Sequence, residues 1–76
     1  MSEADKMFKE LGYYKDFNNR THEYRKELDG EQFEIDFWLN EREISKNNYR
    51  NIGYITIEEL KAINKKCEEL GWIKIG

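Results

Sequence analysis

Residues Ile55 to Trp72 read ITIEELKAINKKCEELGW, and this stretch carries signals for both ends of one helix. Thr56 and Glu59 have the spacing of a capping box, in which each side chain accepts a hydrogen bond from the other residue's backbone amide. Gly71 is placed to adopt the left-handed conformation that ends many helices, so that the next residue folds back over the last turn. We therefore expect a helix from about residue 57 to residue 70.

The apolar residues of this helix recur every three or four positions, which predicts one buried face. They are Ile57, Leu60, Ile63, Cys67 and Leu70. Charges of both signs are interleaved on the opposite face, as on a solvated surface. Because one cysteine cannot form an internal disulfide, Cys67 is interpreted as a small buried hydrophobe.

The same ending occurs near the N-terminus, where the residues from Phe8 to Tyr13 read FKELGY and parallel the phrase CEELGW at 67–72. Ser2 is a suitable N-cap for a helix that ends at this first glycine. A helix of about two turns is unstable alone in water, so we expect its apolar side chains to be buried against other elements. The segments upstream do not match, which indicates one stop signal used twice rather than a duplicated domain.

Between the two helices the apolar period changes to two, which predicts a sheet. Residues 33, 35, 37 and 39 are apolar and alternate with mostly polar residues, as in a half-buried strand. Asp29-Gly30 favours a two-residue type I′ hairpin just before this strand. The hairpin places Tyr24 opposite Ile35 on the apolar face. On the outer face it places Arg25 opposite Glu34, which is favourable, and Glu23 opposite Asp36, which is unfavourable.

Two further turns extend this sheet in both directions. A turn at Asn18-Asn19 pairs Tyr13 with Tyr24, and a turn near Asn40-Glu41 puts Ile44 opposite Phe37. The sequence does not decide whether residues 13–17 form a fourth strand. Residues 46–53 are rich in asparagine and lack a period, which predicts a linker.

The predicted fold is therefore α+β, with a short N-terminal helix, an antiparallel meander of three to four strands and a C-terminal helix. Both helices are expected to pack on one face of the sheet. At 76 residues we expect a single domain over 1–76. We see no apolar run long enough to span a membrane and no signal-peptide pattern, so we expect a cytoplasmic protein.

The acidic residues concentrate on the sheet, although the net charge is only −3. Between Glu23 and Glu43 there are eight acidic and three basic residues. Trp38 falls among them on the outer face, and an exposed indole is a common interface anchor. The candidate protein-binding residues are Glu23, Arg25, Glu34, Asp36, Trp38 and Glu43. Alternatively, Trp38 packs against residues 47–52 and the acids only keep the sheet soluble.

The sequence offers little for catalysis, and we expect no enzyme, no cofactor and no metal site. The single histidine, His22, has no second histidine or cysteine at metal-ligand spacing and is interpreted as structural. Glu34 and Asp36 share one strand face, but a flat exposed sheet offers no pocket to shift their pKa values.

Nucleic-acid binding is the alternative function, with Lys61, Lys65 and Lys66 of the C-terminal helix as its candidate residues. Each of these lysines has an acidic residue within a turn, and the chain is acidic overall. A nucleic-acid-binding module is expected to carry a basic footprint, so this alternative is disfavoured.

The phrases MFKELGY at residues 7–13 and YITIEELKAINKKCEELGW at 54–72 flank a strand with the element Ile35-Asp36-Phe37. This arrangement resembles small uncharacterised proteins encoded by phages and prophages of Gram-positive bacteria. The resemblance implies a phage accessory protein in the host bacterial cytoplasm that binds a host or phage protein. Inhibition of a host defence or replication factor, including anti-CRISPR-like inhibition, is among the options. We expect a monomer or weak homodimer, and the resemblance supplies no site residues.

Overall fold

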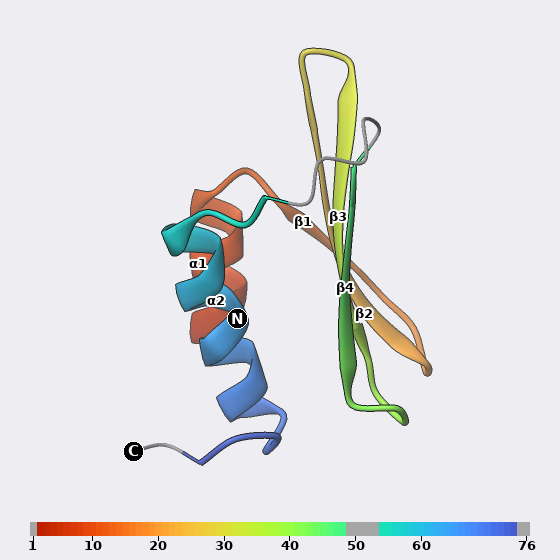
Figure 1. The fold of residues 1–76 in the computed structure, drawn as a ribbon, viewed down its shortest axis with the longest axis vertical. Helices are drawn as coiled ribbons and strands as arrows, with labels where there is room; N and C mark the ends of the chain where they lie inside the picture. The colour runs from red at the N-terminus through yellow and green to blue at the C-terminus, as the bar shows by residue number, and fades with distance from the viewer. Residues whose placement is uncertain (1, 49–53, 75–76) are drawn as a thin grey trace. The chain divides into compact units, whose positions relative to one another are not determined.

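The computed structural model describes residues 2–48 and 54–74 and has an α+β fold (Figure 1). The elements follow in the order α1 (Glu3–Glu10), β1 (Tyr14–Phe17), β2 (Thr21–Leu28), β3 (Glu31–Trp38), β4 (Glu43–Asn48) and α2 (Ile57–Glu69). The chain forms two compact units. We call residues 1–12 and 55–76, with α1 and α2, the helical unit, and residues 13–54, with the four strands, the sheet unit.

The ends of both helices agree with the sequence signals. The Ser2 side chain accepts a hydrogen bond from the Asp5 amide at 3.0 Å, which caps α1. Both hydrogen bonds of the capping box between Thr56 and Glu59 are present at 3.0 Å. Beyond α2, Gly71 has a φ of 76°, and the following amide donates to the carbonyl oxygen of residue 67 at 2.9 Å. These are the features of a Schellman ending, as expected.

Helices α1 and α2 contact each other within the helical unit. The Ala4 amide donates to Oε2 of Glu69 at 3.0 Å, and Lys65 Nζ lies 3.6 Å from Oε2 of Glu3. Ala4 and Phe8 of α1 are fully buried. Burial of these apolar groups and the interhelical polar contacts together stabilise helices that are too short to persist alone.

The buried face of α2 differs from the predicted stripe. Ile57 and Leu60 are 63% and 44% exposed, whereas Glu59, Ala62, Ile63, Lys66 and Cys67 are buried. The three-and-four periodicity holds, but the buried face is rotated from the first turn onward. The Glu59 carboxylate accepts the Thr56 amide, so capping places an acidic residue on this face. The burial of Cys67 is confirmed.

The sheet unit is an antiparallel meander in the order β1-β2-β3-β4. Tyr24 pairs with Ile35, as the Asp29-Gly30 turn predicts, and these two turn residues have φ values of 53° and 78°. Positive φ at both positions defines the type I′ conformation. Phe37 pairs with Ile44, so the third predicted register is also confirmed. The segment that the sequence left undecided forms a fourth strand, β1.

The register of β1 is shifted by two residues from the predicted one. Lys15, not Tyr13, lies opposite Tyr24. The reason is the Asn18 side chain, whose Oδ1 accepts the amides of Arg20 and Thr21 at 2.8 and 2.9 Å and moves the turn along the chain. A slip of two residues keeps each side chain on its predicted face.

The predicted linker at 46–53 is wrong in its first part, because residues 46–48 continue β4 and pair with β3. Residues 49–53 lie outside the described part of the chain. Along the ladder, the cross-strand hydrogen bonds of β3 hold this segment extended despite its weak sequence pattern.

The inner face of the sheet unit carries its aromatic and aliphatic core. Tyr24, Ile35 and Phe37 are fully buried, and the rings of Tyr24 and Phe37 pack edge to face with centroids 5.8 Å apart. His22 stacks on Phe17 at 3.9 Å, which agrees with its structural interpretation.

The packing of both helices on one face of the sheet, like the single domain over 1–76, stays a prediction. Within the described residues, no helix combines the length and apolar character needed to cross a membrane.

Candidate interaction face

The six residues that the sequence proposed for protein binding lie on one side of the sheet unit, which we call the outer face. They form three direct cross-strand pairs, namely Glu23 with Asp36, Arg25 with Glu34, and Trp38 with Glu43. Side chains alternate between the two faces of a strand, so residues at these paired positions point the same way. The structure thus brings all six together.

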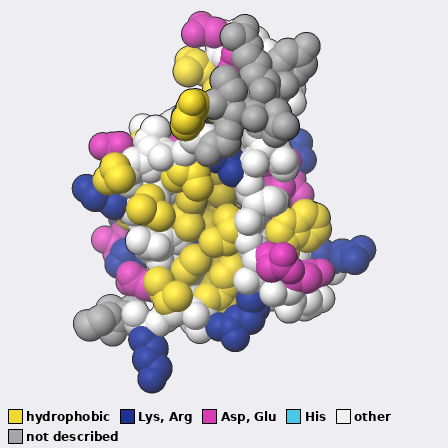
Figure 2. All heavy atoms as spheres, in the orientation of Figure 1, with side chains coloured by type: hydrophobic (Ala, Val, Ile, Leu, Met, Phe, Trp, Pro, Cys, Tyr) yellow, Lys and Arg dark blue, Asp and Glu magenta, His cyan; other side chains and the backbone are white. Residues whose placement is uncertain are grey.

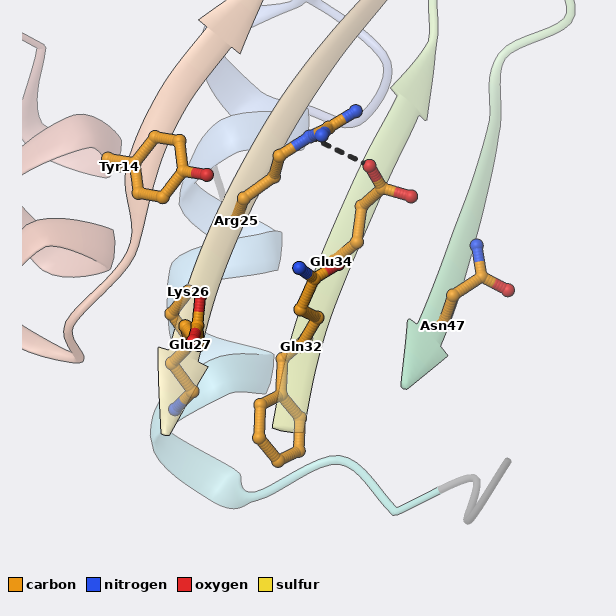
Figure 3. Close-up of a pocket in the computed structure, with 8 residues that line it drawn as sticks. Tyr14, Arg25, Lys26, Glu27, Gln32, Glu34 and Asn47 are labelled. Carbon is orange, nitrogen blue, oxygen red and sulfur yellow. Dashed lines mark ion pairs between the residues drawn. The ribbon is translucent and has the colours of Figure 1, made fainter. Parts of the chain in front are cut away.

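Arg25 is the central cation of this face. Its guanidinium lies 2.6 Å from Oε1 of Glu23, 2.9 Å from Oε1 of Glu34 and 3.7 Å from Oδ2 of Asp16. Figure 3 shows Arg25 reaching from β2 toward Glu34 on β3. The hydrogen bond from Arg25 lowers the pKa of Glu23, and the same hydrogen bond raises the pKa of Arg25. Both groups are therefore held in their charged forms.

Asp36 differs from the exposed acid that the sequence suggested. The residue is only 4% exposed, and Ser45 Oγ donates to its Oδ2 at 3.4 Å. Burial, followed by the negative charges of Glu34 and Glu23, raises the pKa of Asp36 to about 6. The expectation that this sheet face cannot shift a carboxylate pKa is therefore wrong, because neighbouring side chains remove Asp36 from water.

Glu23, Glu34 and Asp36 form what we call the carboxylate cluster. One oxygen atom from each carboxylate lies within 4.8 Å of the others. Glu23 is further fixed by Thr21, whose hydroxyl donates to Oε2 at 3.0 Å. Two of the three carboxylates, those of Glu23 and Glu34, share the guanidinium of Arg25, whereas Asp36 has no ion pair with it among the described residues. Three carboxylates this close together suit the binding of a positive charge.

Trp38 lies at the end of the same face and is 39% exposed. Its indole Nε1 donates to Ser45 Oγ at 3.0 Å, so β4 orients the ring. Glu43, directly opposite on β4, is exposed. Of the segment 47–52 proposed as an alternative cover for Trp38, residues 49–52 fall outside the described part of the chain. The indole of Trp38 is therefore held in place by its N–H group while part of its apolar ring stays accessible.

A pocket of about 350 Å³ lies beside the cluster, and no sequence pattern predicted it. Its lining includes Tyr14, Arg25, Gln32, Glu34 and Asn47, which come from all four strands (Figure 3). Strand pairing alone does not predict such a hollow. The hollow depends on the side-chain conformations of its lining residues, including Arg25 and its ion-pair partner Glu34. The outer face is therefore not flat.

Sequence reasoning also missed the hydroxyl groups that orient the cluster. Thr21 and Ser45 occupy outer-face positions in the predicted hairpin registers, so the pairing pattern could have identified them. Asp16 could not be placed opposite Glu23 until the two-residue shift of β1 was known. Side-chain hydrogen bonds between strands carry no signal in a single sequence.

The three lysines of the alternative function do not form one exposed basic surface. Lys61 is exposed, but Lys66 is 5% exposed. Lys65 lies within 3.6 Å of Glu3 and 3.5 Å of Glu68, and these carboxylates raise its pKa. In Figure 2, the basic side chains on the visible surface lie near acidic ones. The geometry therefore gives nucleic-acid binding no further support.

Comparison with protein-family models, curated proteins and solved structures finds no match for this chain. The resemblance to phage and prophage proteins consequently stays a prediction.

Proposed function

We propose that this chain is a non-enzymatic interaction protein that binds a partner protein through the outer face of its sheet unit. The observation that carries the proposal is the placement of a 39% exposed tryptophan beside exposed Glu43 and the carboxylate cluster. Tryptophan is among the residues most enriched at the energetic centres of interfaces. Its hydrogen bond to Ser45 limits the rotamer entropy that binding removes.

The charge of the outer face defines the chemistry of the partner. Of the six candidate residues on this face, four are acidic and one, Arg25, is basic. A complementary partner surface presents lysine or arginine around an apolar recess that accepts the indole of Trp38. Such complementarity raises the association rate and excludes acidic partners. In the setting that the sequence suggests, the partner is a host or phage protein, and binding inhibits a host defence or replication factor.

A non-enzymatic role agrees with the environment of the two most reactive side-chain types. His22 stacks on Phe17 in the sheet unit. Cys67 is buried in the helical unit, and burial raises the pKa of its thiol, which disfavours the nucleophilic thiolate. These observations favour binding over covalent catalysis.

The test is comparative affinity capture from host lysate with two matched double variants. Trp38→Ala with Glu43→Lys alters the outer face, and Ile57→Ala with Glu58→Lys makes the same kinds of change on exposed residues of the helical unit. We expect the wild type and the helical-unit variant to retain the same partner, and the outer-face variant to lose it. Circular dichroism and thermal melting check that each variant is folded. Equal retention by a folded outer-face variant contradicts the proposal.

The chain can also associate with a second copy of itself through the edge strands of its sheet, and this possibility needs a separate measurement. Strands β1 and β4 are the edge strands of the order β1-β2-β3-β4. Edge strands leave backbone groups unpaired on one side and can pair with a second chain. Analytical ultracentrifugation of the purified protein distinguishes the expected monomer or weak homodimer from a stable oligomer.

A further inference from the structure

The carboxylate cluster has the ligand type and spacing of a cation site. One oxygen from each of Glu23, Glu34 and Asp36 lies within 4.8 Å of the others. Oxygens on opposite sides of a bound Ca²⁺ are separated by about 4.6 to 5.2 Å, given metal–oxygen distances of roughly 2.3 to 2.6 Å. One cation of this size can therefore contact all three carboxylates with small side-chain movements.

A second observation is the state of Asp36. Its side chain belongs to a residue that is 4% exposed, and Oδ1 is buried without a hydrogen-bond partner among the described residues. Ser45 donates to the other oxygen, Oδ2. A buried carboxylate oxygen without a donor is costly and rare in folded proteins. A bound cation or a proton would satisfy this oxygen.

The surrounding groups hold the cluster in a fixed orientation. Thr21 donates to Oε2 of Glu23, and Arg25 binds Oε1 of both Glu23 and Glu34. The ion pair of Glu34 with Arg25 uses Oε1. Outer groups that orient ligating carboxylates in this way strengthen metal binding.

The charge balance agrees with a divalent ion. The cluster carries three negative charges when ionised, and the guanidinium of Arg25 offsets one of them. A divalent cation offsets the remaining two. The only other acid near the guanidinium in the described ion pairs, Asp16, is well exposed to water and its charge is screened.

We propose that Glu23, Glu34 and Asp36 bind one divalent cation, with Ca²⁺ preferred over Mg²⁺. Carboxylate oxygens are hard ligands that suit these ions. Ca²⁺ accepts irregular coordination with additional water ligands, whereas Mg²⁺ demands near-ideal octahedral geometry. Arg25 next to two of the ligands makes an octahedral arrangement difficult. This site does not depend on the identity of the partner protein.

Trp38 supplies a direct readout, because it is linked through Ser45 to Asp36 by two hydrogen bonds. Tb³⁺ replaces Ca²⁺ in oxygen sites and luminesces when a nearby indole is excited. We expect EDTA-treated protein to show indole-sensitised Tb³⁺ emission that saturates at one ion per chain and is displaced by Ca²⁺. Trp38→Phe should abolish the emission while Ca²⁺ binding measured by calorimetry persists. Trp72→Phe leaves the linkage through Ser45 intact and should retain the emission.

Variants of the cluster distinguish this site from general attraction of cations to acidic surface. Asp36→Asn keeps the shape of the side chain and should weaken Ca²⁺ binding by about tenfold or more. Glu34→Gln is the second test, and Glu43→Gln, on the same face but outside the cluster, is the matched control that should bind like the wild type. Equal Ca²⁺ affinity in Asp36→Asn and Glu43→Gln overturns the proposal. So does Tb³⁺ emission that Ca²⁺ fails to displace, in which case a proton rather than a metal ion satisfies Asp36.

Discussion

Asp36 on β3 lies directly opposite Glu23 on β2, so two acidic residues form a cross-strand pair on the outer face. Like charges placed opposite each other are destabilising, and the burial of Asp36 adds a desolvation penalty. Arg25 offsets part of this repulsion through Glu23 and Glu34. Locally unfavourable arrangements of this kind occur mainly at functional sites. The pair therefore supports a functional role for the outer face.

The first prediction concerns the pH dependence of stability in EDTA-containing buffer. The pKa of Asp36 is raised to about 6 from the ordinary value of 3.8, so the folded protein binds this proton more tightly than the unfolded chain does. Its contribution to stability is therefore full at low pH and is lost as pH rises through about 6. Asp36→Asn removes the effect, and its stability relative to wild type should rise by roughly 1 to 1.5 kcal/mol between about pH 5 and about pH 7.5, which is about half of the full linkage effect. Urea unfolding at both pH values measures the difference.

The comparison with wild type isolates Asp36 from its titrating neighbours. Glu23 and Glu34 face it from β2 and β3 together with Arg25, while Ser45 of β4 does not titrate in this range. Glu43→Gln serves as the control and should show no gain with pH. If the stability gain of Asp36→Asn is the same at both pH values, Asp36 ionises normally and the burial argument is wrong.

The second prediction concerns Arg25, which contacts three carboxylates. Arg25→Gln leaves Glu23 and Glu34 without their shared cation and should destabilise the protein by about 1 to 2 kcal/mol at neutral pH without metal. Arg20→Gln is the matched control, because Arg20 is exposed and lies outside this network. Its effect should stay within about 0.5 kcal/mol. Similar losses from both variants would show that the network does not contribute to stability.

The third prediction concerns the capping box of α2. Thr56→Ala removes the acceptor for the Glu59 amide and should destabilise the protein by about 1 kcal/mol. Glu59→Ala removes the reciprocal hydrogen bond, and because the two bonds form one motif, the double variant should lose less than the sum of the single variants. Chemical denaturation of all three gives the coupling energy. Glu58→Ala, in the same helical turn but exposed, should have a smaller effect, and strict additivity would contradict a cooperative box.

Features encoded by neighbouring residues could be predicted from the sequence. The capping box, the Gly71 ending and the Asp29-Gly30 turn depend on residues that are close in the chain, and the hairpin register follows from that turn. The position of β1 could not be predicted, because the Asn18 side chain sets the turn. The buried face of α2 also could not be predicted in full. It includes polar residues such as Glu59, and a periodicity that counts only apolar side chains does not detect them.

The sequence predicted which residues share the outer face, but it did not predict the buried environment of Asp36. Alternation along the strands placed Trp38 and Asp36 on one face, and the structure brings them together as expected. The burial of Asp36 and its raised pKa depend on contacts with Ser45 and the acids of neighbouring strands. Such effects arise from side-chain packing in three dimensions, and composition alone pointed to a solvated acidic surface.

Site-specific photo-crosslinking in the host cell tests most directly whether the outer face is the working surface. A benzophenone amino acid replaces Trp38 in one variant and Ile57, an exposed apolar residue of the helical unit, in the other. Binding through the outer face predicts one discrete crosslinked partner from position 38 and none from position 57. A partner crosslinked from position 57 but not from position 38 would contradict it.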